Sequence, residues 1–135
     1  EAEILPTLRE LGIGLVPFSP LGRGFLTGQV TRENIPEGDW RANMARFKGE
    51  AFERNRALVT ALEAVAARKG GTTGQLAIAW VLAQGTDFAP IPGTRRLDRL
   101  EENIAAADIE LSAADLAEIE AAFPRNAVVG GRYFE

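Results

Sequence analysis

The chain has 135 residues, of which 46% are hydrophobic and 25% charged, a composition typical of ordered globular proteins. Its formal net charge of -4 argues against general nucleic-acid binding, which requires an excess of basic surface. Cysteine and histidine are both absent and Tyr133 is the sole tyrosine, so disulfides, thiolate metal sites and histidine-based catalysis are excluded.

The first fifty residues combine a helical pattern, a strand-like run and a long irregular stretch. Residues 4–11 have apolar side chains at helical spacing and precede a glycine, which predicts a helix. The run IGLVPF, residues 13–18, predicts a short strand buried in a parallel sheet. SPLGRGFLTG, residues 19–28, is predicted to be a glycine-rich loop. Residues 29–50 are predicted to be a long excursion with a short helix near residues 40–47.

The rest of the chain is mainly helical in pattern. Thr72 and Gln75 have the spacing of a capping box, as do Ser112 and Asp115. Four helices are predicted, over residues 51–69, 72–84, 97–107 and 112–123. A second short buried strand, FAPIP, is predicted between the middle two, and the tail from residue 124 to 135 is predicted to be irregular.

The order of these elements indicates the fold class. Strands that are separated by helical connections pair in parallel, with helices covering the sheet. Two strands cannot form a sheet that is buried on both faces, and an eight-stranded β/α barrel needs about 250 residues. The sequence therefore predicts an α/β architecture that is incomplete.

The loop after the first predicted strand contains groups that suit an anion. Ser19 offers a hydroxyl, Leu21 an apolar contact, and Gly22 and Gly24 allow backbone N–H groups to approach closely. Arg23 adds positive charge. The alternative interpretation is a glycine-rich turn with an arginine on the surface.

A second candidate anion site is IPGTRRLDRLEEN, residues 91–103. Thr94 is placed to cap the following helix, whose free N–H groups attract anions. The three arginines within residues 95–99 add charge-assisted hydrogen bonds to a phosphate. The alternative is a solvated helix face on which Arg96 and Arg99 pair with Glu101 and Glu102. Because the loops after the last two strands of a β/α barrel frequently form a phosphate site, the two loops together favour an anion.

Three sequence blocks resemble the aldo/keto reductases, a family of NADP(H)-dependent β/α barrels. ELGIGLVPFSPLGRGFLTG resembles the family's seventh strand and loop, TTGQLAIAWVLAQG its seventh helix, and IPGTRRLDRLEEN its eighth strand and helix start. The resemblance extends over essentially the whole chain. It implies that residues 1–135 are the C-terminal part of a single (β/α)8 TIM barrel domain, without a second domain.

The resemblance assigns contacts to the nicotinamide, pyrophosphate and adenine of the cofactor. Phe18 matches the aromatic residue that stacks on the nicotinamide ring. The loop from Ser19 to Gly24 matches the loop that wraps the pyrophosphate. Glu102 and Asn103 match the pair that contacts adenine.

The resemblance also assigns the residues that hold the adenosine 2'-phosphate. Thr94 and Arg99 match these residues. One branch of the family has a lysine at the position of Gly93, and in this chain the positive charge is carried instead by Arg95 or Arg96. NADP(H) is therefore the expected cofactor. The full expected cofactor set is Phe18, Ser19, Pro20, Leu21, Gly22, Arg23, Gly24, Gly93, Thr94, Arg95, Arg99, Glu102 and Asn103.

The resemblance implies that the catalytic groups lie elsewhere. The family's tetrad of aspartate, tyrosine, lysine and histidine comes from the first half of the barrel, and none of those positions falls in this chain. Tyr133 lies at the wrong end of the pattern to replace the tyrosine. We therefore expect no catalytic residue and no metal ligand here, and an isolated chain without reductase activity.

The leading functional hypothesis is the cofactor-binding portion of an NADPH-dependent aldo/keto reductase, whose complete form transfers a hydride between NADP(H) and a small-molecule carbonyl substrate. The alternatives are a non-catalytic dinucleotide-binding or regulatory module, and a structural dimer of half-barrels joined across exposed sheet edges. The expected partners are the carbonyl substrate of the complete enzyme, and either a second copy of the chain or a complementing N-terminal half. Binding to nucleic acid or to a membrane is not expected. A cytoplasmic location is expected, since no apolar run is long enough to span a membrane and the start does not resemble a signal peptide.

The sequence also predicts the surroundings of four further residues. Trp80 is expected in the core, because it lies in an almost wholly apolar helix. Trp40 is expected either to line a substrate pocket or to anchor the long excursion. Arg125 and Arg132 are expected to be surface charges, although the resemblance implies that the C-terminal segment can border the substrate site.

Overall fold

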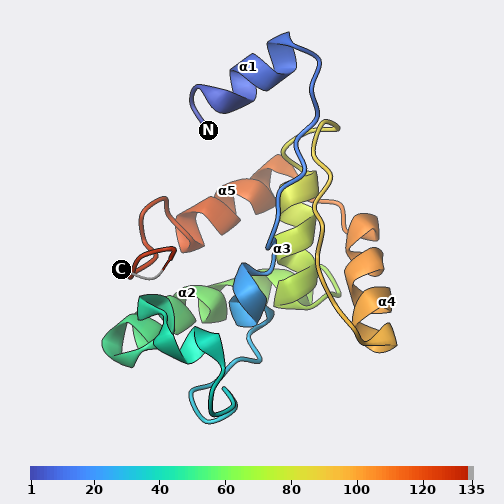
Figure 1. Ribbon diagram of the computed structural model, residues 1–135. Helices are drawn as coiled ribbons and strands as arrows, with labels where there is room; N and C mark the ends of the chain where they lie inside the picture. The colour runs from blue at the N-terminus through green and yellow to red at the C-terminus, as the bar shows by residue number, and fades with distance from the viewer. Residues whose placement is uncertain (134–135) are drawn as a thin grey trace.

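The computed structural model describes residues 1–133 as a set of helices joined by extended segments and turns (Figure 1). Five α-helices occur in this range: α1 (Ile4–Glu10), α2 (Gly49–Arg68), α3 (Thr73–Leu82), α4 (Leu97–Ala105) and α5 (Ala113–Ala122). Four short 3-10 helices accompany them: η1 (Gly22–Thr27), η2 (Trp40–Asn43), η3 (Ala45–Phe47) and η4 (Ala106–Asp108). The predicted helices are thus confirmed, and the tail is irregular as far as it is described, the last two residues lying outside that range.

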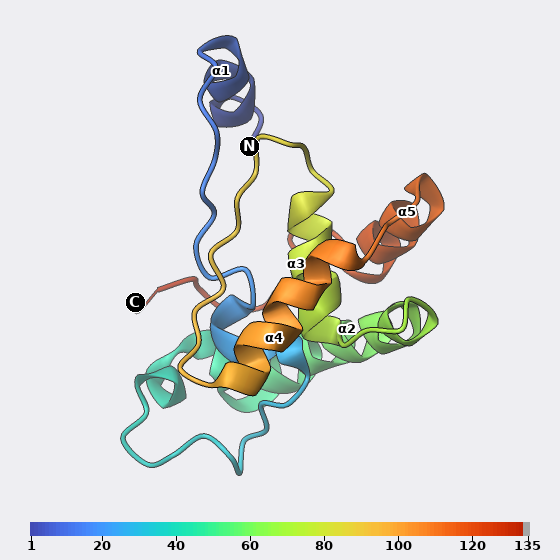
Figure 2. The same cartoon turned by 90° about the vertical axis from the view of Figure 1, so that its right-hand side faces the viewer.

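The two predicted strands are extended segments that meet in isolated parallel bridges. Leu15 bridges to Phe88 and Phe18 to Ile91, so the two segments run side by side, as Figures 1 and 2 show. The backbone N–H of Leu15 donates to the carbonyl of Asp87 at 2.7 Å. Parallel pairing is confirmed, but the prediction of two strands is wrong for the described residues.

The prediction that these segments are buried is also wrong. Val16, Phe18 and Ile91 are each more than half exposed. In Figure 2, α3 and α4 lie to one side of the pair, and the other side is left open along much of its length. Among the described residues no third extended segment bridges to this pair, and its prolines cannot donate to a ladder, so a regular sheet does not form.

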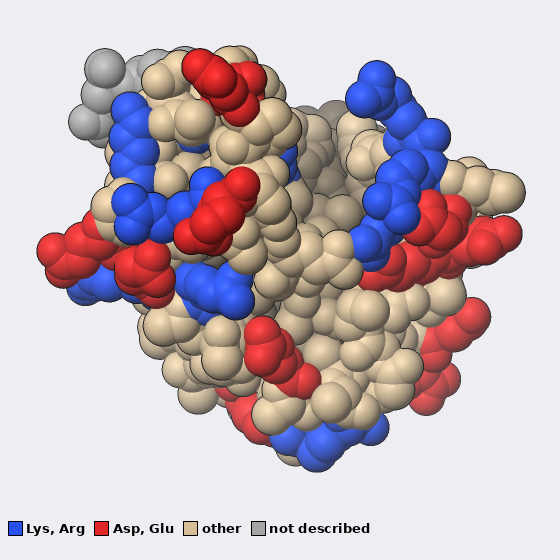
Figure 3. All heavy atoms as spheres, turned by 90° about the horizontal axis from the view of Figure 1, so that it is seen from below, with Lys and Arg blue, Asp and Glu red and all other residues tan. Residues whose placement is uncertain are grey.

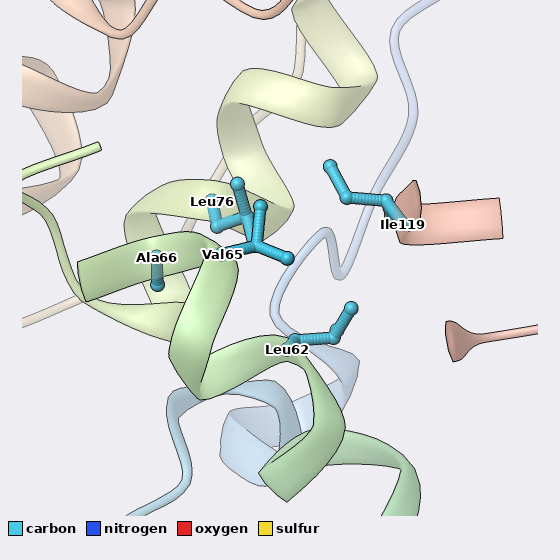
Figure 4. Packing of buried hydrophobic residues seen from close by; sticks show 5 residues of the cluster. All are labelled: Leu62, Val65, Ala66, Leu76 and Ile119. Carbon is cyan, nitrogen blue, oxygen red and sulfur yellow. The ribbon is translucent and has the colours of Figure 1, made fainter. Parts of the chain in front are cut away.

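The main core lies where α2, α3 and α5 meet. Val65 and Leu76 are each 1% exposed, and they pack with the side chains around them at the centre of this contact (Figure 4). The buried cluster consists of Leu62, Val65, Ala66, Leu76 and Ile119. Trp80 packs against its edge, half-buried, which confirms its expected role in the core. Helical spacing of apolar residues on α2 produces this core, since positions three and four apart share one face.

A second cluster fixes the long excursion that follows η1. Met44, Phe47 and Phe52 are buried, and Phe25 makes edge-to-face ring contacts with Phe47 and Phe52 at centroid distances of 5.2 and 5.3 Å. Such aromatic pairs stabilise beyond the area that they bury. The short helix predicted near residues 40–47 is present as η2 and η3.

Both predicted capping boxes are confirmed, and the second is linked to α2. The Ser112 hydroxyl accepts from the backbone N–H of Asp115, and the Asp115 carboxylate accepts from the backbone N–H of Ser112. The Lys69 ammonium at the end of α2 lies 2.6 Å from the same carboxylate. The hydrogen bonds from Lys69 and Ser112 hold the pKa of the Asp115 carboxyl well below its ordinary value.

This lowered pKa predicts a dependence of stability on pH. A carboxyl with a lower pKa in the folded chain stabilises the fold above its unfolded pKa of about 4, and the contribution is lost as the pH falls toward the folded pKa. We expect Asp115→Asn to unfold at lower urea concentration than the parent at neutral pH, and this difference to shrink steadily below about pH 4. Urea unfolding followed by circular dichroism at several pH values measures it. A difference that is the same at all pH values would contradict the assignment.

Within the described residues, none of the helices combines the length and the apolarity that a membrane span requires.

Candidate cofactor-binding site

The loop after the first extended segment has an unusual backbone. Ser19 and Arg23 have positive φ angles of 55° and 61°, which residues other than glycine rarely adopt. The N–H of Gly22 donates to the Ser19 carbonyl at 2.9 Å, and that of Gly24 to the Leu21 carbonyl at 3.0 Å. These bonds hold the left-handed turns in place. Because both glycine N–H groups are used inside the loop, they are not the groups that would meet an anion in this conformation.

Arg23 is held by its surroundings and is not the surface arginine of the alternative interpretation. Its guanidinium lies 5.4 Å from the ring of Trp40 and 5.6 Å from that of Tyr133, and its Nη1 donates to the Arg132 carbonyl at 3.1 Å. Its own carbonyl accepts from Arg41 Nη1 at 3.1 Å. Trp40 therefore contacts the predicted cofactor loop, while the buried second cluster anchors the excursion.

At the second loop, the predicted cap is wrong. The residue that caps α4 is Arg96, without a side-chain hydrogen bond, and the Thr94 hydroxyl accepts from the N–H of Arg96 at 3.1 Å. The hydroxyl thus closes a turn before the helix, because it meets an N–H one residue ahead of the first helical residue, Leu97. The first N–H groups of α4 receive no side-chain cap.

The arginines of this loop differ in their partners. Arg96 Nε donates to Asp98 at 3.0 Å, and this bond lowers the pKa of the Asp98 carboxyl. Arg99 pairs with Glu102, as the solvated-face alternative expects, and it also donates to the side-chain oxygen of Gln29. Arg99 therefore joins the start of α4 to the segment that follows η1.

Glu102 connects the same cluster to α3. Its carboxylate accepts from the Thr72 hydroxyl at 2.8 Å, and its carbonyl accepts from Gln75 Nε2 at 2.9 Å. Glu102 and Asn103 are both half-buried, whereas Gly93, Thr94 and Arg95 are exposed. Among the residues predicted to contact adenine and the 2'-phosphate, Glu102 is thus held by hydrogen bonds, whereas Thr94 is open to solvent.

The two predicted loops lie at the same end of the molecule. Each one follows an extended segment of a parallel pair, and the carboxyl ends of parallel segments meet at one edge. Viewed from below, positive side chains gather at the right of the molecule, over the start of α4, and also at its left and at its lower edge (Figure 3). The contact of Arg99 with Gln29 joins the start of α4 to the segment after η1.

A small hollow lies beside Phe18. It has a volume of about 210 Å³ and is lined by Phe18, Ser19, Gly22, Arg23, Arg46 and Arg132. Arg132 is exposed, as predicted, and its guanidinium lies 5.1 Å from the Phe18 ring centroid. Sequence reasoning did not single out Arg46 at all, because nothing in its local pattern shows that it meets residues 130–132.

A larger hollow of about 360 Å³ lies elsewhere, in the long excursion. It is lined by Arg32, Ile35, Ala42, Phe47, Lys48 and Gly49. None of these residues belongs to the predicted cofactor set. Volume alone would favour this hollow, but only the smaller one is lined by residues of the predicted cofactor set, all of them from the first loop and the segment before it.

Comparison with solved structures defines the fold. A glycerol dehydrogenase from Gluconobacter oxydans, AKR11B4, matches 92% of this chain and 38% of its own, with a TM-score of 0.77 and 24% identity. The thermostable aldo-keto reductase Tm1743, in complex with the inhibitor epalrestat, matches 87% of this chain and 32% of its own, with a TM-score of 0.59 and 24% identity. Both are TIM barrels, so the chain has the fold of a section of such a barrel.

Comparison of sequences defines the family. The model of the aldo/keto reductase family matches residues 1–123, and the chain belongs to that family. The probable aldo-keto reductase 1 of Glycine max is 46% identical over 134 residues, which are 99% of this chain. The aldo-keto reductase yakc of Schizosaccharomyces pombe, whose name specifies NADP(+), is 45% identical over 134 residues, or 98% of this chain. The chain spans 39% of the length of both relatives.

Proposed function

We propose that this chain is the cofactor-binding portion of an NADP(H)-dependent aldo/keto reductase, which transfers a hydride between NADP(H) and a carbonyl substrate. The observation that carries the proposal is the meeting of the two predicted loops at one end of the parallel pair, joined by the contact of Arg99 with Gln29. Membership of the family and the NADP(+) in the name of the yeast relative support the choice of cofactor.

The residues present fit the two ends of such a cofactor. The Phe18 ring is 53% exposed and offers an apolar surface for the nicotinamide. At the other end, Arg99 presents a guanidinium whose position is set by Glu102 and Gln29, which suits a 2'-phosphate. When bound, the cofactor would supply the hydride, and these residues would orient it.

Isothermal titration of the purified chain with NADPH tests the proposal. We expect saturable binding, weaker for NADH because that cofactor lacks the 2'-phosphate that Arg99 is proposed to hold. Absence of heat at millimolar NADPH, with the chain shown by circular dichroism to be folded, would refute cofactor binding and favour a structural role.

The same sample should not turn over. The chain contains no histidine, and Tyr133 makes ring contacts with two arginines rather than pairing with a lysine or a carboxylate in the described structure. We expect no carbonyl-dependent loss of NADPH absorbance under conditions where NADPH binding is measured. Turnover that disappears in Tyr133→Phe would contradict this expectation and identify Tyr133 as the proton donor.

The exposed apolar residues support a second part of the proposal, a covering partner. Val16 and Ile91 on the extended pair, and Leu97 and Ile104 on α4, are all more than half exposed. Exposed apolar surface of this kind marks an interface. We propose that the remainder of an aldo/keto reductase barrel, or a second copy of this chain, covers it.

A further inference from the structure

Three arginines from distant parts of the chain line the hollow beside Phe18. Arg23 comes from η1, Arg46 from η3 and Arg132 from the C-terminal segment, and together they enclose a volume of about 210 Å³. We call this hollow the three-arginine pocket. Two of its arginines lie outside the segments that the family resemblance assigns to the cofactor.

None of these arginines is neutralised within residues 1–133. Arg46 Nε donates to the Gly130 carbonyl at 3.1 Å, and Arg23 donates to the Arg132 carbonyl at the same distance. No described carboxylate lies within 4.0 Å of a nitrogen of the three. Seven other arginines of the described chain pair with a carboxylate, whereas Arg54, Arg56 and Arg95 do not. The pocket is distinguished by gathering three such arginines around one hollow.

The three positive charges act on one another. Burial, together with repulsion from Arg23 and Arg132, lowers the pKa of the Arg46 guanidinium. An arginine remains charged despite such a shift, so the repulsion persists in the folded chain. A bound oxyanion would relieve it and accept charge-assisted hydrogen bonds.

A buried amide holds the pocket together. Asn55 on α2 is 4% exposed, and its Nδ2 donates to the Val129 carbonyl at 2.9 Å and to the Arg46 carbonyl at 3.3 Å. Its Oδ1 accepts from the Val129 N–H at 2.8 Å. The segments that carry Arg46 and Arg132 are thus fixed to the same helix.

The C-terminal segment also passes very close to η3. At Gly130, φ is 93° and an added Cβ would lie 2.9 Å from the backbone nitrogen of Arg46. Only glycine permits this approach. The approach brings the Arg46 side chain and the Arg132 backbone to the same hollow.

We propose that the three-arginine pocket binds the oxyanion of an acidic carbonyl substrate, a carboxylate or a phosphate monoester, beside the Phe18 ring. The word substrate rests on the proposed function. The pocket volume suits a small acid and is below the usual size of sites for larger ligands, about 300 Å³ and above. Two of its arginines come from η3 and the C-terminal segment, so the site extends beyond the predicted cofactor loop.

Amide chemical-shift titration of the chain with pyruvate, and separately with its uncharged methyl ester, tests the proposal without any cofactor. We expect pyruvate to shift amides near residues 46 and 130–133, and the ester to bind at least about tenfold more weakly, since it lacks the charge-assisted hydrogen bonds. Arg132→Gln and Arg46→Gln should each weaken pyruvate binding by about tenfold. Arg125→Gln removes one charge from the same terminal region and should change nothing.

Three outcomes would overturn the proposal. Equal binding of pyruvate and its ester, or unchanged pyruvate binding in Arg132→Gln, would show that the pocket does not select anions. If Arg132→Gln weakens NADPH binding as strongly as pyruvate binding, the pocket serves the cofactor pyrophosphate and not a substrate. Because Arg132 is exposed, Arg132→Gln is expected to fold. The test therefore stays valid even if Arg46→Gln fails to fold. A chain that binds pyruvate but not NADPH would refute the proposed function alone.

Discussion

Replacing Arg99 with alanine is expected to weaken NADP(H) binding by about 10- to 100-fold and NAD(H) binding far less. The proposed contact of Arg99 is the 2'-phosphate, which only NADP(H) has, and hydrogen bonds between charged groups are the strong ones. The structure adds that the guanidinium is already oriented by Glu102 and Gln29, with the side chain 29% exposed. Little ordering is then needed on binding. Calorimetric titration of parent and variant with both cofactors measures the difference.

A matched control separates this effect from a general loss of charge. Arg125→Ala removes one positive charge from an arginine whose side chain is 88% exposed and paired only with Glu1 among the described residues. We expect it to bind both cofactors as the parent does. Equal losses of NADP(H) and NAD(H) binding in Arg99→Ala would mean that Arg99 does not hold the 2'-phosphate.

Phe52→Ala is expected to lower the free energy of unfolding by about 3–5 kcal/mol. The Phe52 side chain is 2% exposed, packs against Met44 and Phe47, and makes an edge-to-face contact with the Phe25 ring. Its removal would leave a cavity under the excursion that carries Arg46. Because small domains are stable by only about 5–15 kcal/mol, this loss is a large part of the total. Urea unfolding followed by circular dichroism measures it.

Ile104→Ala provides the comparison for that experiment. Ile104 is also a large apolar residue in a helix, but it is 64% exposed. We expect its replacement to change the free energy of unfolding by no more than about 0.5 kcal/mol. Similar losses in the two variants would show that the second cluster is not a packed core.

The helices could be predicted from the sequence because their determinants are local. Apolar residues at helical spacing place α2 and α3, and the Thr72 and Ser112 capping boxes mark two helix starts. The capping by Thr94 could not be predicted, since a shift of one residue in the helix start changes which N–H its hydroxyl meets. The family was also predicted, and the match over residues 1–123 confirms it.

The strands and the pocket could not be predicted because they depend on distant parts of the molecule. The apolar runs at residues 13–18 and 88–92 have the pattern of buried strands, but burial needs neighbours that the pattern does not specify. Arg46 and Arg132 are 86 positions apart, and they line one hollow because Asn55 and Gly130 fix residues 129–130 against η3. No local signal near Arg46 indicates such a contact.

The most direct test of the central claim is amide chemical-shift mapping of the whole chain with NADPH. The account predicts that the largest shifts fall in residues 18–24 and 93–103, and that Arg99→Ala reduces those in the second group at equal NADPH concentration. Shifts concentrated at the larger hollow, around Ile35 and Phe47, or no shifts at millimolar NADPH, would contradict the claim that the two loops form a cofactor site.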